Sequence, residues 1–317
     1  MKWCILSPLV LALSGFGQQS SSVTATTRVD INGHRVVDGP EVIQRKSPNG
    51  SEVTEKMQSV NGRMVPLERI EERVIRDDAS GRVVERVRQR FDPQGNPALS
   101  TKETIEEQKH SDGSATIQAT TYTGDINGRM QMVERSVTEA RKSDSSESAE
   151  TVVQRPTLNG SVETVERKSK TTVKQPGGSY QEESTTYRKD TNGSFYQAVR
   201  QTTEHTVRNG EATDNTASYE RGSSGQLELH DQTVAKTITH SDGSKDAVVD
   251  IYGNSVPGRA GTDGLKLKEQ QLIERTPGPN GTVIETLSVR RPTVSDPNKL
   301  GPSQQLSQTV CKGDCKP

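Results

Sequence analysis

Two copies of the pentapeptide His-Ser-Asp-Gly-Ser, at 110–114 and 240–244, place an imidazole, a hydroxyl and a carboxylate side by side. These are the groups of a hydrolytic triad, in which histidine takes the serine proton and aspartate orients the histidine. Neighbouring strand residues point to opposite faces, whereas triad groups converge from separated positions. The spacing instead indicates turns in which Asp112 and Asp242 accept backbone N–H groups. We therefore expect no catalytic residue and no enzymatic activity.

Two further acidic stretches, Asp125-Ile126-Asn127-Gly128 and Asp190-Thr191-Asn192-Gly193, resemble the start of a calcium-binding loop. An EF-hand loop needs a bidentate glutamate at its twelfth position, and Ser136 and Gln201 stand there instead. These stretches are typical of turns. We expect no metal ion and no cofactor.

The two pentapeptides belong to an internal repeat. Glycines that follow a turn residue recur every 32 or 33 residues, and a second series with a similar period lies about half a period away. The first series is Gly62, Gly95, Gly128, Gly160, Gly193 and Gly225, and the second includes Gly50, Gly81, Gly113, Gly178, Gly210 and Gly243. Asn-Gly and Asp-Gly pairs tolerate the positive φ angles of two-residue hairpin turns. Each period therefore predicts one β-hairpin.

The pattern predicts an all-β fold, in which tandem hairpins form a long, thin antiparallel meander sheet. Hydrophobic residues make up 28% of the chain and aromatic residues 3%, too few for a thick core. A β-solenoid, which encloses such a core, is therefore the second choice, and the low hydrophobicity leaves a largely disordered chain open. An outer-membrane barrel suits the number of strands, but the apolar lipid-facing band and aromatic girdles of that class are missing.

The N-terminus predicts export. Residues 1–17 combine a lysine, an apolar run and small residues near its end, as in a secretory signal peptide. No later segment is apolar enough to span a membrane as a helix, so we expect no transmembrane span after signal removal. In an oxidising compartment Cys311 and Cys315, four positions apart, are expected to form a local disulfide.

The repeat boundaries give the domain organisation. We expect a polar linker over 18–27, the tandem hairpins over 28–254, an interrupted final hairpin over 255–290 and a proline-rich tail over 291–317.

Charge and composition guide the functional hypothesis. The 41 basic and 42 acidic side chains leave no excess for neutralising phosphates, which argues against a nucleic-acid partner. We expect an exported, non-enzymatic scaffold, structural or adhesive, that is secreted, periplasmic or on the cell surface. Its partners would be an extracellular or surface protein, a polysaccharide, or further copies of itself. The alternative is a carbohydrate- or protein-binding module whose ligand contacts are Tyr180, Tyr187, Phe195, Tyr196 and Tyr219.

Overall fold

The computed structural model describes residues 20–29, 35–47, 50–61, 63–124, 129–222, 224–253, 264–293, 295–296, 299–313 and 315. The expected signal peptide lies outside these residues. None of the helices formed by the described part of the chain is long and apolar enough to cross a membrane.

The described residues form nineteen β-strands in a single sheet, together with two 3-10 turns. In chain order the elements are β1 (Ser20–Val29), β2 (Arg35–Val37), β3 (Glu41–Lys46), β4 (Glu52–Val60), β5 (Arg63–Asp78), β6 (Gly81–Phe91), β7 (Pro97–Lys109), β8 (Ser114–Gly124), β9 (Met130–Lys142), β10 (Ser146–Pro156), β11 (Val162–Lys174), η1 (Pro176–Gly178), β12 (Tyr180–Lys189), β13 (Phe195–Arg208), β14 (Glu211–Arg221), β15 (Leu227–Thr239), β16 (Lys245–Gly253), β17 (Lys266–Pro277), η2 (Pro279–Gly281), β18 (Val283–Arg290) and β19 (Gln304–Gly313).

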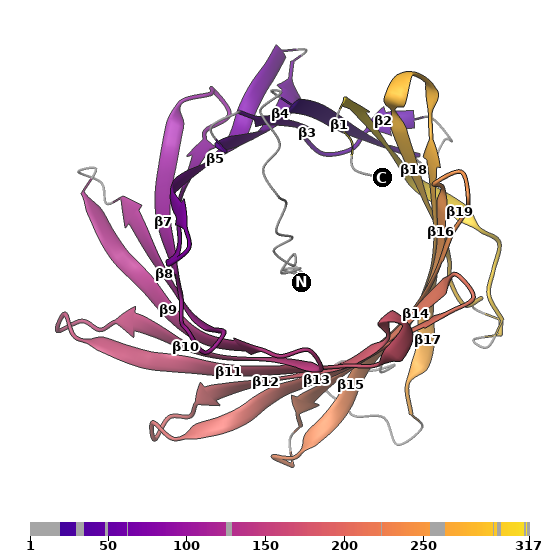
Figure 1. Ribbon diagram of the computed structural model, residues 1–317. Coiled ribbons are helices and arrows are strands. Elements are labelled where there is room, and N and C mark those ends of the chain that lie inside the picture. Colours follow the sequence, from indigo (N-terminus) through magenta and orange to yellow (C-terminus); the bar gives the residue numbers. More distant parts are fainter. Residues whose placement is uncertain are drawn as a thin grey trace.

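The sheet closes on itself, because the last strand pairs with the first. From β3 to β19 each strand is antiparallel to the next, and β19 then pairs with β1 over Ser307–Gly313. Both β2 and β3 pair with β1, so together they act as one interrupted strand of a closed 18-stranded barrel (Figure 1). The expected open, thin meander is therefore wrong. The solenoid and the disordered chain are excluded by the same antiparallel ladder.

A ring of β-bulges accounts for the closure. The ladder skips one residue in every second hairpin of the wall, always a few residues from the turn. The residues skipped in this ring are Leu67, Ala98, Val133, Val165, Ala198, His230, Lys268 and Leu306, and a further skip, at Ile75, lies between β5 and β6. A bulge bends its strand and increases the local twist. Repeated at one level around the sheet, such bends curl it until its edges meet.

The edges that meet come from segments with no expected role in the sheet. Strand β1 occupies most of the expected polar linker over 18–27, and β19 lies within the expected proline-rich tail over 291–317. These two segments are strands, and their pairing removes the exposed edges that an open sheet would present.

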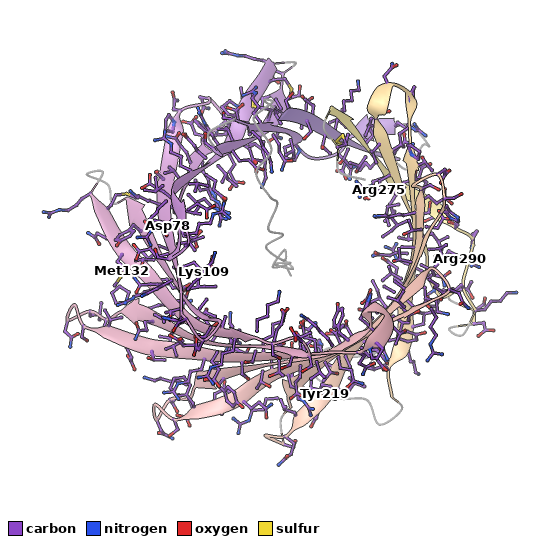
Figure 2. All side chains as sticks on the ribbon, viewed as in Figure 1. Asp78, Lys109, Met132, Tyr219, Arg275 and Arg290 are labelled. Carbon is purple, nitrogen blue, oxygen red and sulfur yellow. A yellow bond between two sulfur atoms is a disulfide. The ribbon has the colours of Figure 1, made fainter. Side chains whose placement is uncertain are left out.

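Strand register divides the wall into an inner and an outer face. Lys109 and Arg275 point into the lumen, whereas Met132 and Arg290 point outward (Figure 2). Side chains two residues apart share a face, and directly paired residues on neighbouring strands do too. The strand pairing extends this assignment around the barrel. Ala115, for example, faces the lumen because it is paired with Lys109.

The two ends of the barrel differ. At one end, termed the short-turn rim, lie the tight turns after β5, β7, β13 and β15, together with the start of β1 and the end of β19. At the other end, termed the loop rim, lie the ends of β16 and β18, which are separated in sequence from the next strands by 254–265 and 291–303.

Candidate functional site

The two His-Ser-Asp-Gly-Ser copies are matching turns on the short-turn rim. The Oδ1 atom of Asp112 accepts the backbone N–H of Ser114 at 2.9 Å and its hydroxyl at 2.6 Å. Asp242 accepts the same two groups of Ser244 at 2.9 and 2.6 Å. The serine hydroxyl, followed by the serine N–H, holds the pKa of each aspartate below its ordinary value. The carboxylates therefore stabilise turns and orient no histidine.

The aromatic residues expected to contact a ligand do not form one surface. Tyr180 faces the lumen, where its ring stacks on that of His205 with 4.6 Å between centroids. Tyr187 and Tyr219 belong to the outer face, as Figure 2 shows for Tyr219. The barrel wall therefore separates residues that are close in the sequence.

The other two aromatic residues are covered by cations. The guanidinium of Arg167 lies 4.6 Å from the ring centroid of Phe195, and that of Arg221 lies 4.5 Å from the ring centroid of Tyr196. Cation–π contacts of this kind contribute about 0.5–1 kcal/mol at exposed sites. These rings are thus engaged within the wall, and the five aromatic residues offer no shared platform for a sugar.

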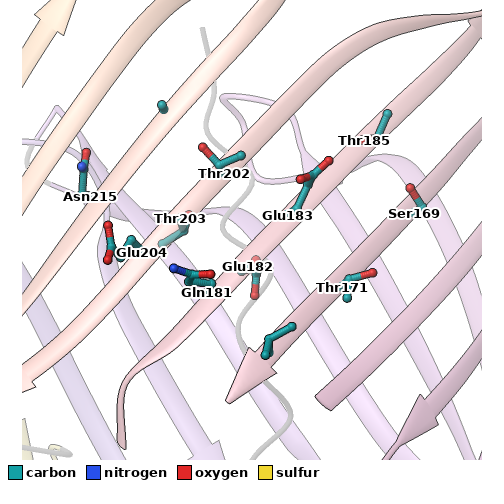
Figure 3. Close-up of a pocket in the computed structure, with 12 residues that line it drawn as sticks. Ser169, Thr171, Gln181, Glu182, Glu183, Thr185, Thr202, Thr203, Glu204 and Asn215 are labelled. Carbon is teal, nitrogen blue, oxygen red and sulfur yellow. The ribbon is translucent and has the colours of Figure 1, made fainter. Parts of the chain in front are cut away.

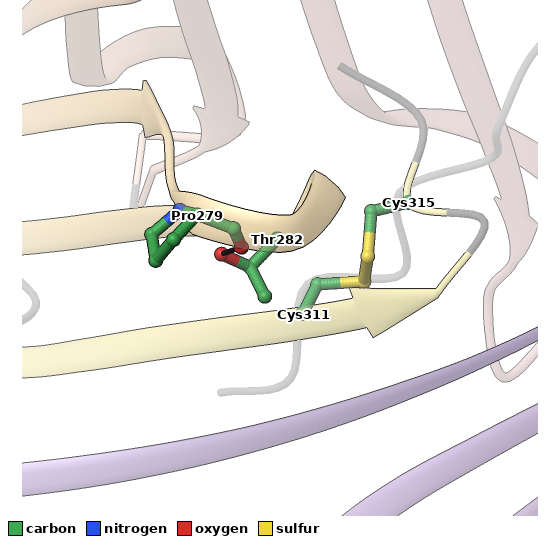
Figure 4. The surroundings of a disulfide bond; sticks show 4 residues. All are labelled: Pro279, Thr282, Cys311 and Cys315. Carbon is green, nitrogen blue, oxygen red and sulfur yellow. Dashed lines mark hydrogen bonds between the residues drawn. A yellow bond between two sulfur atoms is a disulfide. The ribbon is translucent and has the colours of Figure 1, made fainter.

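Cys311 and Cys315 are joined by a disulfide, with 5.9 Å between their Cα atoms (Figure 4). Cys311 lies in β19 and pairs with Thr24 of β1 on one side and Val283 of β18 on the other. The bond therefore fixes the C-terminal end of the chain at the seam where the barrel closes.

The inner face of β6 carries a row of three arginines. Arg86, Arg88 and Arg90 are two residues apart, so they share the face that looks into the lumen. Glu85, by contrast, belongs to the outer face. These three consecutive inner-face positions of β6 thus carry only arginines, with no carboxylate between them.

Carboxylates on the neighbouring strands meet the arginine row. The ion pairs are Arg86–Glu72 at 2.8 Å, Arg86–Glu103 at 2.8 Å, Arg88–Glu68 at 3.4 Å and Lys56–Glu68 at 2.6 Å. The arginine side chains keep between 37% and 59% of their surface exposed. They are therefore fixed in position by their partners and still accessible to a solute in the lumen.

Beside this row the inner wall is hollowed into a concavity of about 860 Å³ that extends from β7 to β12. Small apolar side chains form its floor, and charged side chains surround them. The floor contains Ala115, Ile117, Ala140 and Ala149, and the charged residues include Lys109, Lys142, Lys170, Glu107, Glu147 and Glu182. Such a surface suits a small solute with an apolar part and a charged group.

The outer wall is polar as well. A second concavity of about 590 Å³ crosses β11 to β14 and is lined mainly by hydroxyl, amide and carboxylate groups of the outer face (Figure 3). Ion pairs also face outward, namely Arg45–Glu55, Lys102–Glu85 and Arg200–Glu183. The sequence suggested that a continuous apolar band is missing, and the outer face shows charges where such a band would lie.

Neither a protein-family model nor a curated protein sequence matches this chain. Among solved structures, OpdK of Pseudomonas aeruginosa with vanillate aligns with a TM-score of 0.57 and 8% identity, over 93% of this chain and 97% of that one. OpdO of the same organism aligns with a TM-score of 0.55 and 6% identity, over 93% and 96%. These likenesses show the fold, a closed 18-stranded antiparallel barrel. Such barrels are typically non-enzymatic.

This fold corrects three expectations. The structural or adhesive scaffold needed a sheet with both faces free, but closure turns one face into a lumen. The carbohydrate- or protein-binding alternative, with its extracellular protein or polysaccharide partners, needed the aromatic residues on one surface. The barrel wall instead places Tyr180 and Tyr187 on opposite faces. The expectation of no membrane span rested on the lack of a later apolar helix and of a lipid-facing apolar band, whereas barrels like these span with strands. Among the described residues no group of three or more His, Cys, Asp or Glu side chains is arranged to hold a metal.

Proposed function

We propose that the chain forms a channel in an outer membrane, through which small polar solutes pass. The observation that carries this proposal is the closed wall with a charged, hydroxyl-rich inner face. Barrels with 16 to 18 strands enclose a water-filled lumen, whereas barrels of about eight strands are filled by their own side chains. A polar lumen of this width offers water and small solutes a path.

The arginine row of β6 supports a preference for solutes that carry an anionic group. Arg86, Arg88 and Arg90 present guanidinium groups that bind carboxylates or phosphates with two parallel hydrogen bonds. Glutamates on the flanking strands hold the arginines without covering them. An anionic group could therefore be passed from one arginine to the next along the strand.

The two rims support an orientation. Transmembrane barrels of bacteria place short turns on the periplasmic side and longer loops outside. Here both ends of the sheet, at Ser20 and Gly313, lie on the short-turn rim, and the two longest separations between consecutive strands, β16 to β17 and β18 to β19, open on the other rim, although that rim also carries tight turns such as Asp190–Ser194. We place the short-turn rim in the periplasm.

The charged residues of the outer face affect how the barrel inserts into a membrane. An arginine or lysine facing lipid costs about 2–4 kcal/mol at the bilayer midplane. Arg45 and Arg200 each have a carboxylate partner within 2.9 Å, and pairing reduces the net charge that the lipid meets. This surface is the feature on which insertion depends.

The experiment is reconstitution of the exported protein into planar lipid bilayers. We expect stepwise conductance increases and, in liposomes, swelling in small sugars but not in large ones. The control is a variant lacking residues 304–313, which removes β19 and leaves the barrel open. A wild-type protein that stays soluble without detergent and gives no conductance would overturn the proposal, and the outward ion pairs would account for that result.

A further inference from the structure

The lumen wall formed by β14 and β15 has the opposite charge to that of β6. Their inner faces carry Asp214, Glu220, Glu228 and Asp231. Among the described residues of these two strands, no lysine or arginine lies on the inner face; Lys236, for example, pairs with Thr213 on the outer face. Across the lumen lies β7, which pairs with β6 (Figure 1). The wall of β14 and β15 is therefore acidic, whereas the arginines of β6 are matched by glutamates of β5 and β7.

Two histidines lie against the carboxylates of this acidic wall. On β13, His205 faces the lumen directly opposite Asp214, and its Nδ1 atom lies 2.6 Å from a carboxylate oxygen of that residue. On its other side the His205 ring stacks on Tyr180. The ring is thus held between two strands, with only 18% of the side chain exposed.

The second histidine occupies a position in the ring of bulges. His230 is the residue that the ladder between β14 and β15 skips. Its Nδ1 atom lies 3.0 Å from Asp231, and its Nε2 atom lies 4.0 Å from Glu220. The bulge therefore places an imidazole between two carboxylates of the inner face, where an ordinary ladder position would not.

We propose that His205 and His230 are specificity-determining residues of the lumen, because their protonation sets the charge of the acidic wall. With both imidazoles neutral, the wall is anionic and favours solutes with a positively charged group. With both protonated, Asp214, Asp231 and Glu220 are offset, and that preference falls. This inference rests on the proposed channel function and deepens it.

Other titratable groups lie near the two histidines. From β12, Tyr180 stacks on His205 and interacts with Glu182, and on β15 Glu228 is paired with Glu220, which lies near His230. The cation of β16 on this face is Lys245, at the short-turn rim. Carboxyl, phenol and amine groups ordinarily titrate outside pH 5 to 8, whereas imidazoles titrate within it. The charge change of this wall thus belongs to the two histidines.

The test is the reversal potential of the reconstituted channel in a potassium chloride gradient, measured at about pH 8 and about pH 5, the range over which histidine changes charge. We expect the cation-to-anion permeability ratio of the wild-type channel to fall from the higher pH to the lower pH. The double variant His205→Gln/His230→Gln should show the same permeability ratio at both pH values. The matched control His240→Gln alters a turn on the short-turn rim, so it should show the wild-type shift.

Each outcome has one meaning. A channel that conducts but shows the same pH shift with and without the two histidines overturns this inference and leaves the channel function standing. A wild-type protein that never conducts overturns both. If the double variant fails to fold, the single variant His230→Gln replaces it, because this side chain is 47% exposed at a bulge. That variant should lose part of the shift, and an unchanged shift contradicts the inference.

Discussion

The hydroxyl oxygens of Thr26 and Thr309 lie 3.0 Å apart and share a hydrogen bond, although 283 residues separate them in the chain. They are direct partners on β1 and β19, and both face the lumen. Similar threonine pairs join β9 to β10 and β13 to β14. The seam is therefore built like any other pair of strands in the wall.

The seam can be tested with a pair of cysteines. In the variant Thr26→Cys/Thr309→Cys, we expect a disulfide between the two new residues, because directly paired strand positions lie within reach of such a bond. Peptide mapping under non-reducing conditions detects it. The control Thr26→Cys/Thr138→Cys joins residues of distant strands and should leave both thiols free. Free thiols in the first variant would show an open sheet.

Gly81 lies against the carbonyl oxygen of Glu107, at the place where any other residue would put its Cβ atom. We expect Gly81→Ala to push β6 away from β7 and to lower the melting temperature strongly. The control is Gly113→Ala, where φ is also positive but no atom lies within 4 Å of the added methyl group. That change should cost only the strain of the backbone, about 1–2 kcal/mol. Equal effects in thermal melts would contradict the close packing of β6 on β7.

The turn aspartates predict a pH effect with a definite sign. Ser114 donates two hydrogen bonds to the Asp112 carboxylate, which lowers its pKa in the folded protein. This contact therefore contributes its full share to the free energy of unfolding above the ordinary aspartate pKa. That contribution is lost as the pH falls through the lowered pKa that Asp112 has in the folded protein. In Ser114→Ala the pKa of Asp112 should rise toward its ordinary value, as measured by NMR titration of the carboxyl carbon. Asp242, in the matching turn, is the internal control and should not change.

The arginine row predicts anion permeability. Replacing Arg86 with glutamine removes a cation from the lumen and leaves Glu72 and Glu103 without their partner, so the anion-to-cation permeability ratio should fall. The matched control is Arg45→Gln, which removes an outward cation paired with Glu55 and should leave the ratio unchanged. Because these ion pairs are partly exposed, each contributes no more than about 1 kcal/mol and both variants should fold. Equal effects on the ratio would contradict the inward direction of Arg86.

We propose that Cys311 and Cys315 are also paired in the exported protein. Peptide mapping should recover one intramolecular bond. The variant Cys311→Ser/Cys315→Ser should fold, because the closed loop is short and constrains little of the unfolded chain. Its C-terminal residues should exchange amide hydrogens faster, since the bond holds this end at the seam. Unchanged exchange would show that β19 is held by its strand pairing alone.

The sequence alone determined where the strands turn. At Asn209-Gly210 the φ angles are 53° and 83°, which an Asn-Gly pair adopts at little cost. At Asp112 the carboxylate and the following glycine define the turn in the same local way. Such turns depend on a few adjacent residues, so their chemistry can be read directly from the chain.

The tertiary structure alone decided the closure and the two faces. Threonine, arginine and glutamate occupy both faces of the wall, so a period of two residues does not say which face is inside; Arg86 looks inward and Arg45 outward with similar neighbours in sequence. Tyr180 and Tyr187 are separated by the ordinary alternation of β12, because an odd number of positions lies between them. Closure is the sum of small twists over the whole sheet, and it joins Thr26 to Thr309 only once every strand between them is in place.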